Sequence, residues 1–170
     1  YHTALGLLTA QADVNSGFYQ FDTAWGSEDE ADTLSRAYLL GWQQQYGQWQ
    51  HQAQLSRNLD REVTFGPDSR SPFNTQRDEF SYQVTTDLTP NLSLLTGVNW
   101  YQEQVDKSAT AYEQTSRINR AAFAGLNYQH DALQLEAAAR RDVINRYGGQ
   151  NTWQLAAGYQ LAEHWLVRAS

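Results

Sequence analysis

The sequence predicts an all-β chain: an antiparallel up-and-down meander of about ten long strands that is part of a transmembrane β-barrel. Three observations support this prediction. Apolar and polar side chains alternate along most of the chain. The candidate strands run to roughly 10–14 residues, longer than the usual strands of soluble proteins. Short turns near residues 13, 47, 90, 131 and 163 alternate with longer polar loops at 26–33, 61–76, 104–116 and 143–151.

The last hairpin shows the alternation most clearly. Residues 151–161 place Trp153 and Tyr159 on one face and polar or small residues on the other, because strand side chains alternate with period two. Residues 165–170 continue the pattern after a turn at 162–164. Pairing Leu161 with Trp165 and Tyr159 with Val167 keeps one face apolar, so we expect this register.

Upstream residues repeat the pattern. The first expected strand is 4–11, with Leu5 and Leu7 on its apolar face, and a turn at 13–17 leads into 18–26, with Tyr19, Phe21 and Trp25 in phase. Further strands are expected at 34–46, 49–60, 80–88, 92–101, 118–128 and 133–142, with two-residue turns at 47–48 and 130–131 and a tight turn at Pro90. The 130–131 turn predicts that Tyr128 faces Leu133.

The strands can be sorted into two faces. We expect one face to meet lipid, with the members Tyr38, Leu40, Trp42, Leu55, Tyr82, Leu94, Val98, Leu126, Leu135, Leu155 and Tyr159. We expect the other to face a water-filled lumen, with the members Gln50, Gln52, Gln54, Ser81, Gln83, Gln134, Glu136 and Gln154. Three charged residues and one amide share this polar face: Arg117, Arg140, Asp142 and Asn119. Arg120 and Arg141 instead fall on the apolar face: toward the loop end they would reach headgroups, whereas at mid-membrane they would contradict the face assignment.

Composition bounds the function. The chain has 170 residues, no cysteine and a formal net charge of −7. A single domain is expected, thiolate chemistry and cysteine metal sites are excluded, and the charge argues against a nucleic-acid partner. The four histidines have no nucleophile and carboxylate at suitable positions, so we do not expect an enzyme. Both chain ends read as mid-strand, so residues 1–170 are expected to be a partial β-barrel domain of a longer polypeptide.

Two other interpretations stay open at this point. The first is a self-contained ten-stranded outer-membrane barrel, either a porin or a surface protease. The second is a soluble β-sandwich binding module, in which the apolar faces pack on each other. The polar ribbon from Gln50 to Asp60 suits a lumen and a solvated outer face equally well, so this ribbon does not decide between them.

A resemblance to a known family narrows the choice. Asn151-Thr152-Trp153-Gln154, Ala157-Gly158-Tyr159 and Val167-Arg168-Ala169-Ser170 resemble a stretch of TonB-dependent outer-membrane receptors, most of all the cobalamin transporters. Residues 126–141 and 97–102 are also similar to the barrel of that family. The family pattern continues beyond residue 170, and the plug domain and the closing C-terminal strand of the family are not in this sequence.

The resemblance implies a 22-stranded barrel with a plug in its lumen. It implies energy-coupled uptake of a scarce ligand, here cobalamin, through the outer membrane of a Gram-negative bacterium. TonB would act through parts that this chain lacks, while lipid and lipopolysaccharide would contact the barrel wall.

Two sets of loop residues are candidates for sites. Ligand contacts are expected among Asp68, Arg70, Phe73, Asn74 and Tyr112, which are polar or aromatic residues of the longer loops. The acidic stretch with Glu28, Asp29 and Asp32 is a candidate calcium site, because clustered carboxylates suit this ion and the resembling transporters use acidic loops for calcium. The sequence has no Asp-x-Asp-x-Asp-Gly spacing, so no ligand set can be carried over.

Overall fold

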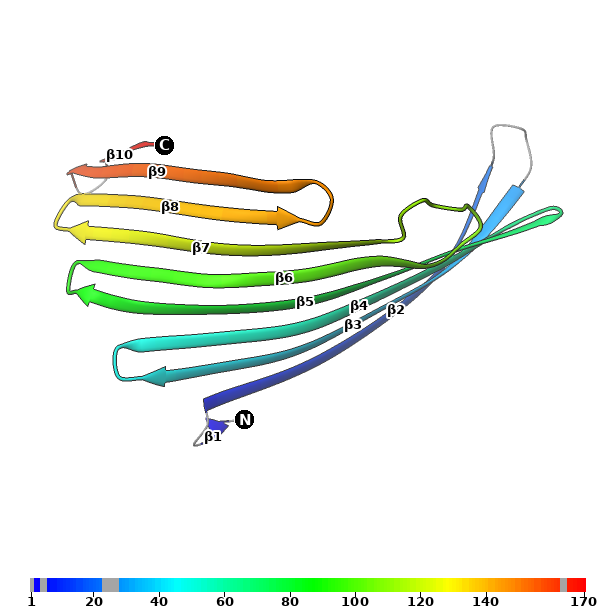
Figure 1. Ribbon diagram of the computed structural model, residues 1–170, viewed down its shortest axis with the longest axis horizontal. Coiled ribbons are helices and arrows are strands. Elements are labelled where there is room, and N and C mark those ends of the chain that lie inside the picture. Colours follow the sequence, from blue (N-terminus) through cyan, green and yellow to red (C-terminus); the bar gives the residue numbers. More distant parts are fainter. Residues whose placement is uncertain (1, 4–5, 23–27, 163–164) are drawn as a thin grey trace.

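The computed structural model describes residues 2–3, 6–22, 28–162 and 165–170. These residues form one ten-stranded sheet in which every strand is antiparallel to its neighbours in the chain (Figure 1). The meander predicted from the sequence is therefore confirmed. The strands are β1 His2–Thr3, β2 Gly6–Asp22, β3 Glu28–Tyr46, β4 Trp49–Gly66, β5 Ser69–Thr89, β6 Leu92–Ser108, β7 Ser116–His130, β8 Leu133–Ile144, β9 Gly148–Ala162 and β10 Trp165–Ala169.

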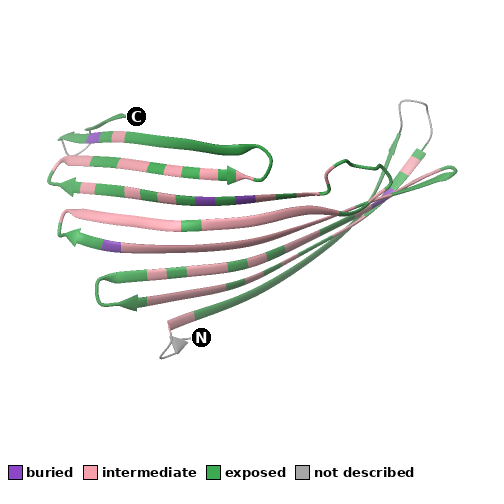
Figure 2. Ribbon diagram, viewed as in Figure 1, coloured by how far each residue is buried: buried purple, intermediate pink, exposed green. Residues whose placement is uncertain are grey.

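The sheet is a single curved layer. Among the described residues the buried apolar side chains are only Ala31, Val63 and Ala121, and exposed or half-exposed residues line every long strand (Figure 2). A β-sandwich needs a second sheet packed on one face, and the strands described here form no second sheet. β1 and β10 lie at opposite edges of the described sheet, so these strands do not close into a ten-stranded barrel either.

The two predicted faces are confirmed by the strand register. Leu55 of β4 is opposite Leu40 and Phe80, and Gln54 is opposite Gly41 and Ser81. Following such pairs across the sheet puts all eleven residues expected on the apolar face on one side and all eight expected on the polar face on the other. We call these the apolar face and the polar face.

The turn predicted at residues 13–17 is wrong. These residues lie inside β2, which pairs with β3 without interruption from Leu7 to Asp22. Asp, Asn, Ser and Gly favour turns locally, but the continuous ladder to β3 overrides that preference. The face predicted for Leu7 is also wrong. Leu7 is opposite Gln43 on the polar face, and Leu8 is opposite Trp42 on the apolar face. Leu5 and Trp25 lie outside the described residues.

Most of the predicted long loops are strand. β4 and β5 continue through 61–76 and leave only Pro67 and Asp68 as a turn. β8 and β9 fill most of 143–151, β3 begins at Glu28, and β6 continues to Ser108, so that 109–115 is the longest connection in the described chain. β2 to β5 extend well beyond the ends of β7, β8 and β9 (Figure 1). In these extensions polar residues occur on both faces, as with the neighbours Arg61 and Glu62 of β4, so the alternation that marks a strand is weaker there.

Two hairpin registers differ from those predicted. Tyr128 is opposite Leu135 rather than Leu133, because Asp131, with φ 49°, and Ala132 form the turn. A slip of two residues leaves each side chain on the same face. In the last hairpin Tyr159 is opposite Val167 as predicted, but Trp165 is opposite Ala162 across a register shift. Residues 163–164 of the expected turn lie outside the described part.

The strands are staggered as in a tilted barrel wall. Trp49, the first residue of β4, is opposite Thr86 of β5, which is opposite Leu94 of β6. β6 itself begins two residues before Leu94, at Leu92. In the same way Leu92 is opposite Tyr128 of β7, which is opposite Leu135 of β8, and β8 begins two residues before Leu135, at Leu133. One residue of shift per strand, at about 3.3 Å of rise and about 4.8 Å of strand spacing, corresponds to a tilt of about 35°, which is in the range of closed barrels.

The described residues contain no helix long and apolar enough to cross a membrane.

Candidate functional site

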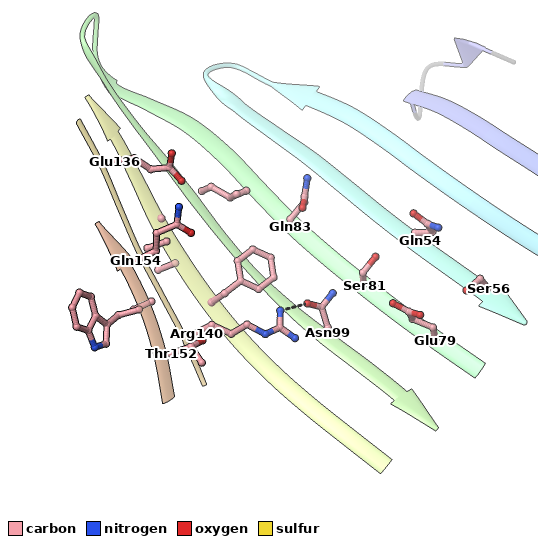
Figure 3. A pocket seen from close by; sticks show the side chains of 17 residues that line it. Gln54, Ser56, Glu79, Ser81, Gln83, Asn99, Glu136, Arg140, Thr152 and Gln154 are labelled. Carbon is pink, nitrogen blue, oxygen red and sulfur yellow. Dashed lines mark hydrogen bonds between the residues drawn. The ribbon is translucent and has the colours of Figure 1, made fainter. Parts of the chain in front are cut away.

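The polar face is hollowed by the curvature of the sheet. A cavity of about 570 Å³ extends over this face from β4 to β9. Gln54, Ser81, Gln83, Asn99 and Arg140 lie along it (Figure 3). Its lining mixes amide, hydroxyl and charged groups with the ring of Phe123. Such a surface can hold water or a polar partner through many hydrogen bonds.

Arg140 joins three strands across this face. Its Nε donates to Asp142 Oδ2 at 2.8 Å and its Nη1 donates to Asn99 Oδ1 at 2.9 Å. Asn119 Nδ2 donates to Asp142 Oδ1 at 3.0 Å. The guanidinium also lies 5.8 Å from the centre of the Phe123 ring. These contacts link β6, β7 and β8, so Arg140 is held in one orientation within the cavity.

A second charged cluster lies nearer the end of the sheet that carries the β4–β5 and β6–β7 connections, which we call the loop end; the opposite end, with the β3–β4 and β5–β6 turns, is the turn end. Arg77 Nη1 is 2.9 Å from Glu103 Oε1 and Arg77 Nη2 is 3.0 Å from Glu79 Oε2. Arg117 Nε donates to Glu103 Oε2 at 3.0 Å, and the Arg77 guanidinium stacks 4.4 Å from the centre of the Tyr101 ring. This cluster lines a second cavity of about 510 Å³ together with Asp60 and Tyr147.

The charged pairs order the wall more than they stabilise it. Their side chains keep 31–49% exposure around Glu103, and ion pairs that open to water contribute about 0–1 kcal/mol each. The sequence pattern placed Arg117, Asn119, Arg140 and Asp142 on one face, and the structure confirms this. The sequence pattern did not identify Arg77 and Glu103 as partners. Arg77 directly follows residues 61–76 and Glu103 directly precedes residues 104–116, and both of these segments were expected to be loops.

The five ligand-contact candidates are distributed over both faces. Asp68 lies in the β4–β5 turn, while Arg70, Phe73 and Asn74 lie in β5. Phe73 is opposite Glu62 on the polar face, whereas Arg70 and Asn74 are opposite Phe65 and Arg61 on the other face. Arg70 lies over the Phe65 ring at 5.8 Å from its centre. We conclude that Arg70 and Phe73 cannot contact one ligand from the same side of the strand.

Phe73 and Tyr112 are brought together. Their ring centres are 6.5 Å apart in an edge-to-face arrangement, and both side chains are exposed. Tyr112 comes from the 109–115 connection, which is tied to the sheet by hydrogen bonds from Ala109 N to Pro72 O and from Val105 N to Thr115 O. These two rings form an aromatic platform at the loop end. That any of the five candidates binds a ligand stays a prediction.

Tyr19 adds a hydroxyl to the loop end of the polar face, near Glu62. Desolvation first, and then the charge and hydrogen bond of Glu62, raise the pKa of Tyr19 above its usual value. The Tyr19 hydroxyl donates its single hydrogen to the Glu62 carboxylate.

The calcium candidates lie in a strand rather than in a loop. Glu28, Asp29 and Asp32 belong to β3, and alternation turns Asp29 away from the face that Glu28 and Asp32 share. No group of three His, Asp or Glu side chains suited to a metal ion occurs in the part of the chain that the structure describes. The residues as placed do not form a calcium site, and calcium binding stays a prediction.

His51 is a packed residue of the apolar face. Its Nδ1 is 2.7 Å from Tyr82 Oη, and its ring lies near Trp42 and Tyr46. Neighbouring aromatic rings explain the position of this histidine without any catalytic role.

Comparison with known proteins identifies the fold family. The family model described as TonB dependent receptor-like, beta-barrel, matches residues 2–170. The chain belongs to this family. Its members are receptors rather than enzymes, and the match covers all the described strands.

Curated relatives of the family give a finer comparison. The chain is 28% identical over 167 residues to the vitamin B12 transporter BtuB of Photobacterium profundum, with 96% of this chain and 27% of the relative covered. It is 29% identical over 170 residues to BtuB of Vibrio cholerae serotype O1, with 96% and 28% covered. For BtuB of Vibrio vulnificus the values are 29% over 99 residues, with 56% and 16% covered. The chain thus spans just over a quarter of the length of the first two relatives.

Proposed function

We propose that this chain is a wall segment of an outer-membrane receptor that takes up vitamin B12 by energy coupling through TonB. The observation that carries the proposal is the separation of apolar and polar faces over β3 to β9, in a chain that belongs to a receptor barrel family over residues 2–170. The names of the relatives support vitamin B12 as the ligand.

The apolar face would meet lipid. On β6 it runs from Leu92 to Trp100, a difference of eight residues (100 − 92). At about 3.3 Å per residue and a tilt of about 35°, this is about 22 Å along the membrane normal. The apolar band of outer-membrane barrels is about 25 Å tall. Trp49 at the turn end and Trp100 at the loop end lie where aromatic girdles are usual.

The polar face would line the transport pathway. Its cavity contains fixed donors and acceptors, among them Arg140 held by Asn99 and Asp142. These groups can hydrogen-bond to water or to a second domain in the lumen. Because they already pair with one another, they would not bind a passing ligand tightly. In this account Arg140 and Asp142 position the wall, while the ligand first meets the loop end.

The loop-end platform of Phe73 and Tyr112 would contact the ligand. Two exposed rings in edge-to-face contact offer a rigid apolar surface at low entropic cost. A corrinoid ring with amide side chains is large, flat and partly apolar, so it suits such a surface.

Uptake of radiolabelled vitamin B12 tests the proposal. The full-length protein that carries this chain is expressed in Gram-negative cells that lack their own vitamin B12 transporter. We expect accumulation that stops when the proton-motive force is dissipated. Uptake that continues without the proton-motive force would indicate a porin-like channel, and an absence of uptake would exclude vitamin B12 as the ligand.

A further inference from the structure

Several arginines on the side of the apolar face form no salt bridge among the described residues, and two of them, Arg120 and Arg141, lie on adjacent strands at its border. Arg120 of β7 is opposite Trp100 and Val143, and Arg141 of β8 is opposite Ala122 and Asn151. Among the described residues neither arginine forms a salt bridge. A cation on a face that meets hydrocarbon is costly unless it finds an anion or the interface. Their presence here therefore requires an explanation.

The Arg141 side chain reaches toward the row of Arg120. Its Nη1 donates to Asn151 Oδ1 at 3.0 Å, and its Nη2 lies 3.0 Å from the position that a Cβ on Gly149 would take. Gly149 is opposite Val143, which in turn is opposite Arg120. Arg120, Val143 and Gly149 form one row of paired residues across β7, β8 and β9, and the guanidinium of Arg141 lies at the Gly149 end of this row. Arg120 and Gly149 are two strand spacings apart, or about 10 Å. Two long, flexible arginine side chains can converge on one group across that distance.

This row lies at the loop-end border of the apolar face. The next rows toward the turns carry Ala122, Val98 and the pair Ala124–Ala139. Asp78, on the same face, is already bound by Arg57 Nη2 at 3.0 Å. The patch is thus a local excess of positive charge on a chain of net charge −7, directly above an apolar surface.

We propose that Arg120 and Arg141 together bind the phosphate of an anionic lipid headgroup, whose acyl chains lie on the apolar face toward the turns. Guanidinium groups form paired, charge-assisted hydrogen bonds with phosphate oxygens. Charge complementarity selects a phosphate, and continuity with the apolar face selects an amphiphile over a free ion. The inference rests on the proposed placement of the apolar face in a membrane.

Lipid binding to the intact protein tests the site. The full-length protein in nonionic detergent is titrated with diphosphorylated lipid A, and bound lipid is measured by native mass spectrometry. A phosphate-free glycolipid of equal chain length and inorganic phosphate serve as comparison probes. We expect Arg120→Gln with Arg141→Gln to weaken lipid A binding about tenfold or more, since two charged hydrogen-bond sets are removed. Arg141→Lys, which keeps the charge but loses the planar fork, should fall between the double variant and the wild type.

A matched double variant controls for charge alone. Arg36→Gln with Arg61→Gln removes two exposed arginines from the same face of β3 and β4, and we expect less than a twofold change. Equal losses in both double variants would overturn the site in favour of general electrostatic attraction. Unchanged binding in the Arg120 and Arg141 variant, or equal binding of the phosphate-free lipid, would also overturn it. Vitamin B12 uptake is measured in parallel, so that loss of the lipid site with normal uptake leaves the proposed function intact.

Discussion

Replacing Gly97 by alanine should strain the barrel wall at one point. Gly97 lies on the polar face of β6, beneath the ring of Phe123 from β7. A Cβ at this position would lie 2.4 Å from Phe123 Cζ and 2.7 Å from the backbone oxygen of Tyr82. Ordinary contacts begin near 3.4 Å, so the overlaps are 1.0 Å (3.4 − 2.4) and 0.7 Å (3.4 − 2.7). The ring can turn away, but the Tyr82 carbonyl belongs to a paired strand and cannot.

We expect Gly97→Ala to lower the free energy of unfolding by about 1–3 kcal/mol, as for other overpacked sites. Gly125→Ala is the matched control. Gly125 lies on the same face of the adjacent strand, and its added Cβ would meet its nearest atoms at 3.8 Å and 3.9 Å. This substitution should be neutral or stabilise by about 0.4–1 kcal/mol, because alanine restricts the unfolded chain.

Urea unfolding of the full-length protein in phospholipid vesicles, followed by heat-modifiable gel mobility, measures both variants. Adding Phe123→Leu to Gly97→Ala should restore only part of the loss, because the contact with the Tyr82 oxygen remains. If Gly97→Ala and Gly125→Ala unfold at the same urea concentration, the close packing of Phe123 over Gly97 is refuted.

Three further predictions concern the polar face and the loop end. Asp142→Asn weakens the charged bonds from Arg140, so the free energy of unfolding should drop by about 1 kcal/mol; an unchanged urea midpoint would show that water replaces these bonds. Phe73→Ala should weaken vitamin B12 binding to cells about tenfold, while Phe65→Ala, on the opposite face of the same hairpin, should not; equal effects would remove the platform from the site. Weak calcium binding by the acidic stretch predicts a calorimetric heat that disappears in Asp29→Asn with Asp32→Asn, and identical isotherms would contradict it.

The sequence predicted the faces well because their signal is local. Wherever one face is apolar and the other polar, the alternation identifies both at once, as in residues 49–60. The same signal cannot detect a register slip of two residues, which leaves each side chain on its face. Tyr128 and Leu135 therefore form a pair that the pattern alone did not predict.

The loop end was harder to predict for a physical reason. Where water bathes both faces of a strand, both faces are polar, and no alternation distinguishes strand from loop. The composition of residues 61–76 and 143–151 therefore predicts loops, although these residues are mostly strand. At residues 13–17 turn-forming composition favoured a break, while pairing with β3 decided the outcome.

The candidate site was predicted only in part. Phe73 and Tyr112 were both named, but their contact depends on how the 109–115 connection folds back over β5. Arg77 and Glu103 form a close pair on the polar face, but a cross-strand partner cannot be assigned while the strands around it are read as loops. Residues chosen for loop position alone, such as Arg70 and Asn74, proved to lie on the other face.

Cysteine labelling in native outer membranes tests the central claim, that the apolar face meets lipid and the polar face meets water. Single cysteines are introduced into the full-length protein at three positions of each face and exposed to a membrane-impermeant maleimide. The polar-face positions are Gln52, Gln54 and Gln83, and the apolar-face positions are Leu40, Leu55 and Val98. Our account predicts labelling of the polar-face set and protection of the apolar-face set. Preferential labelling of Leu40, Leu55 and Val98 would contradict it.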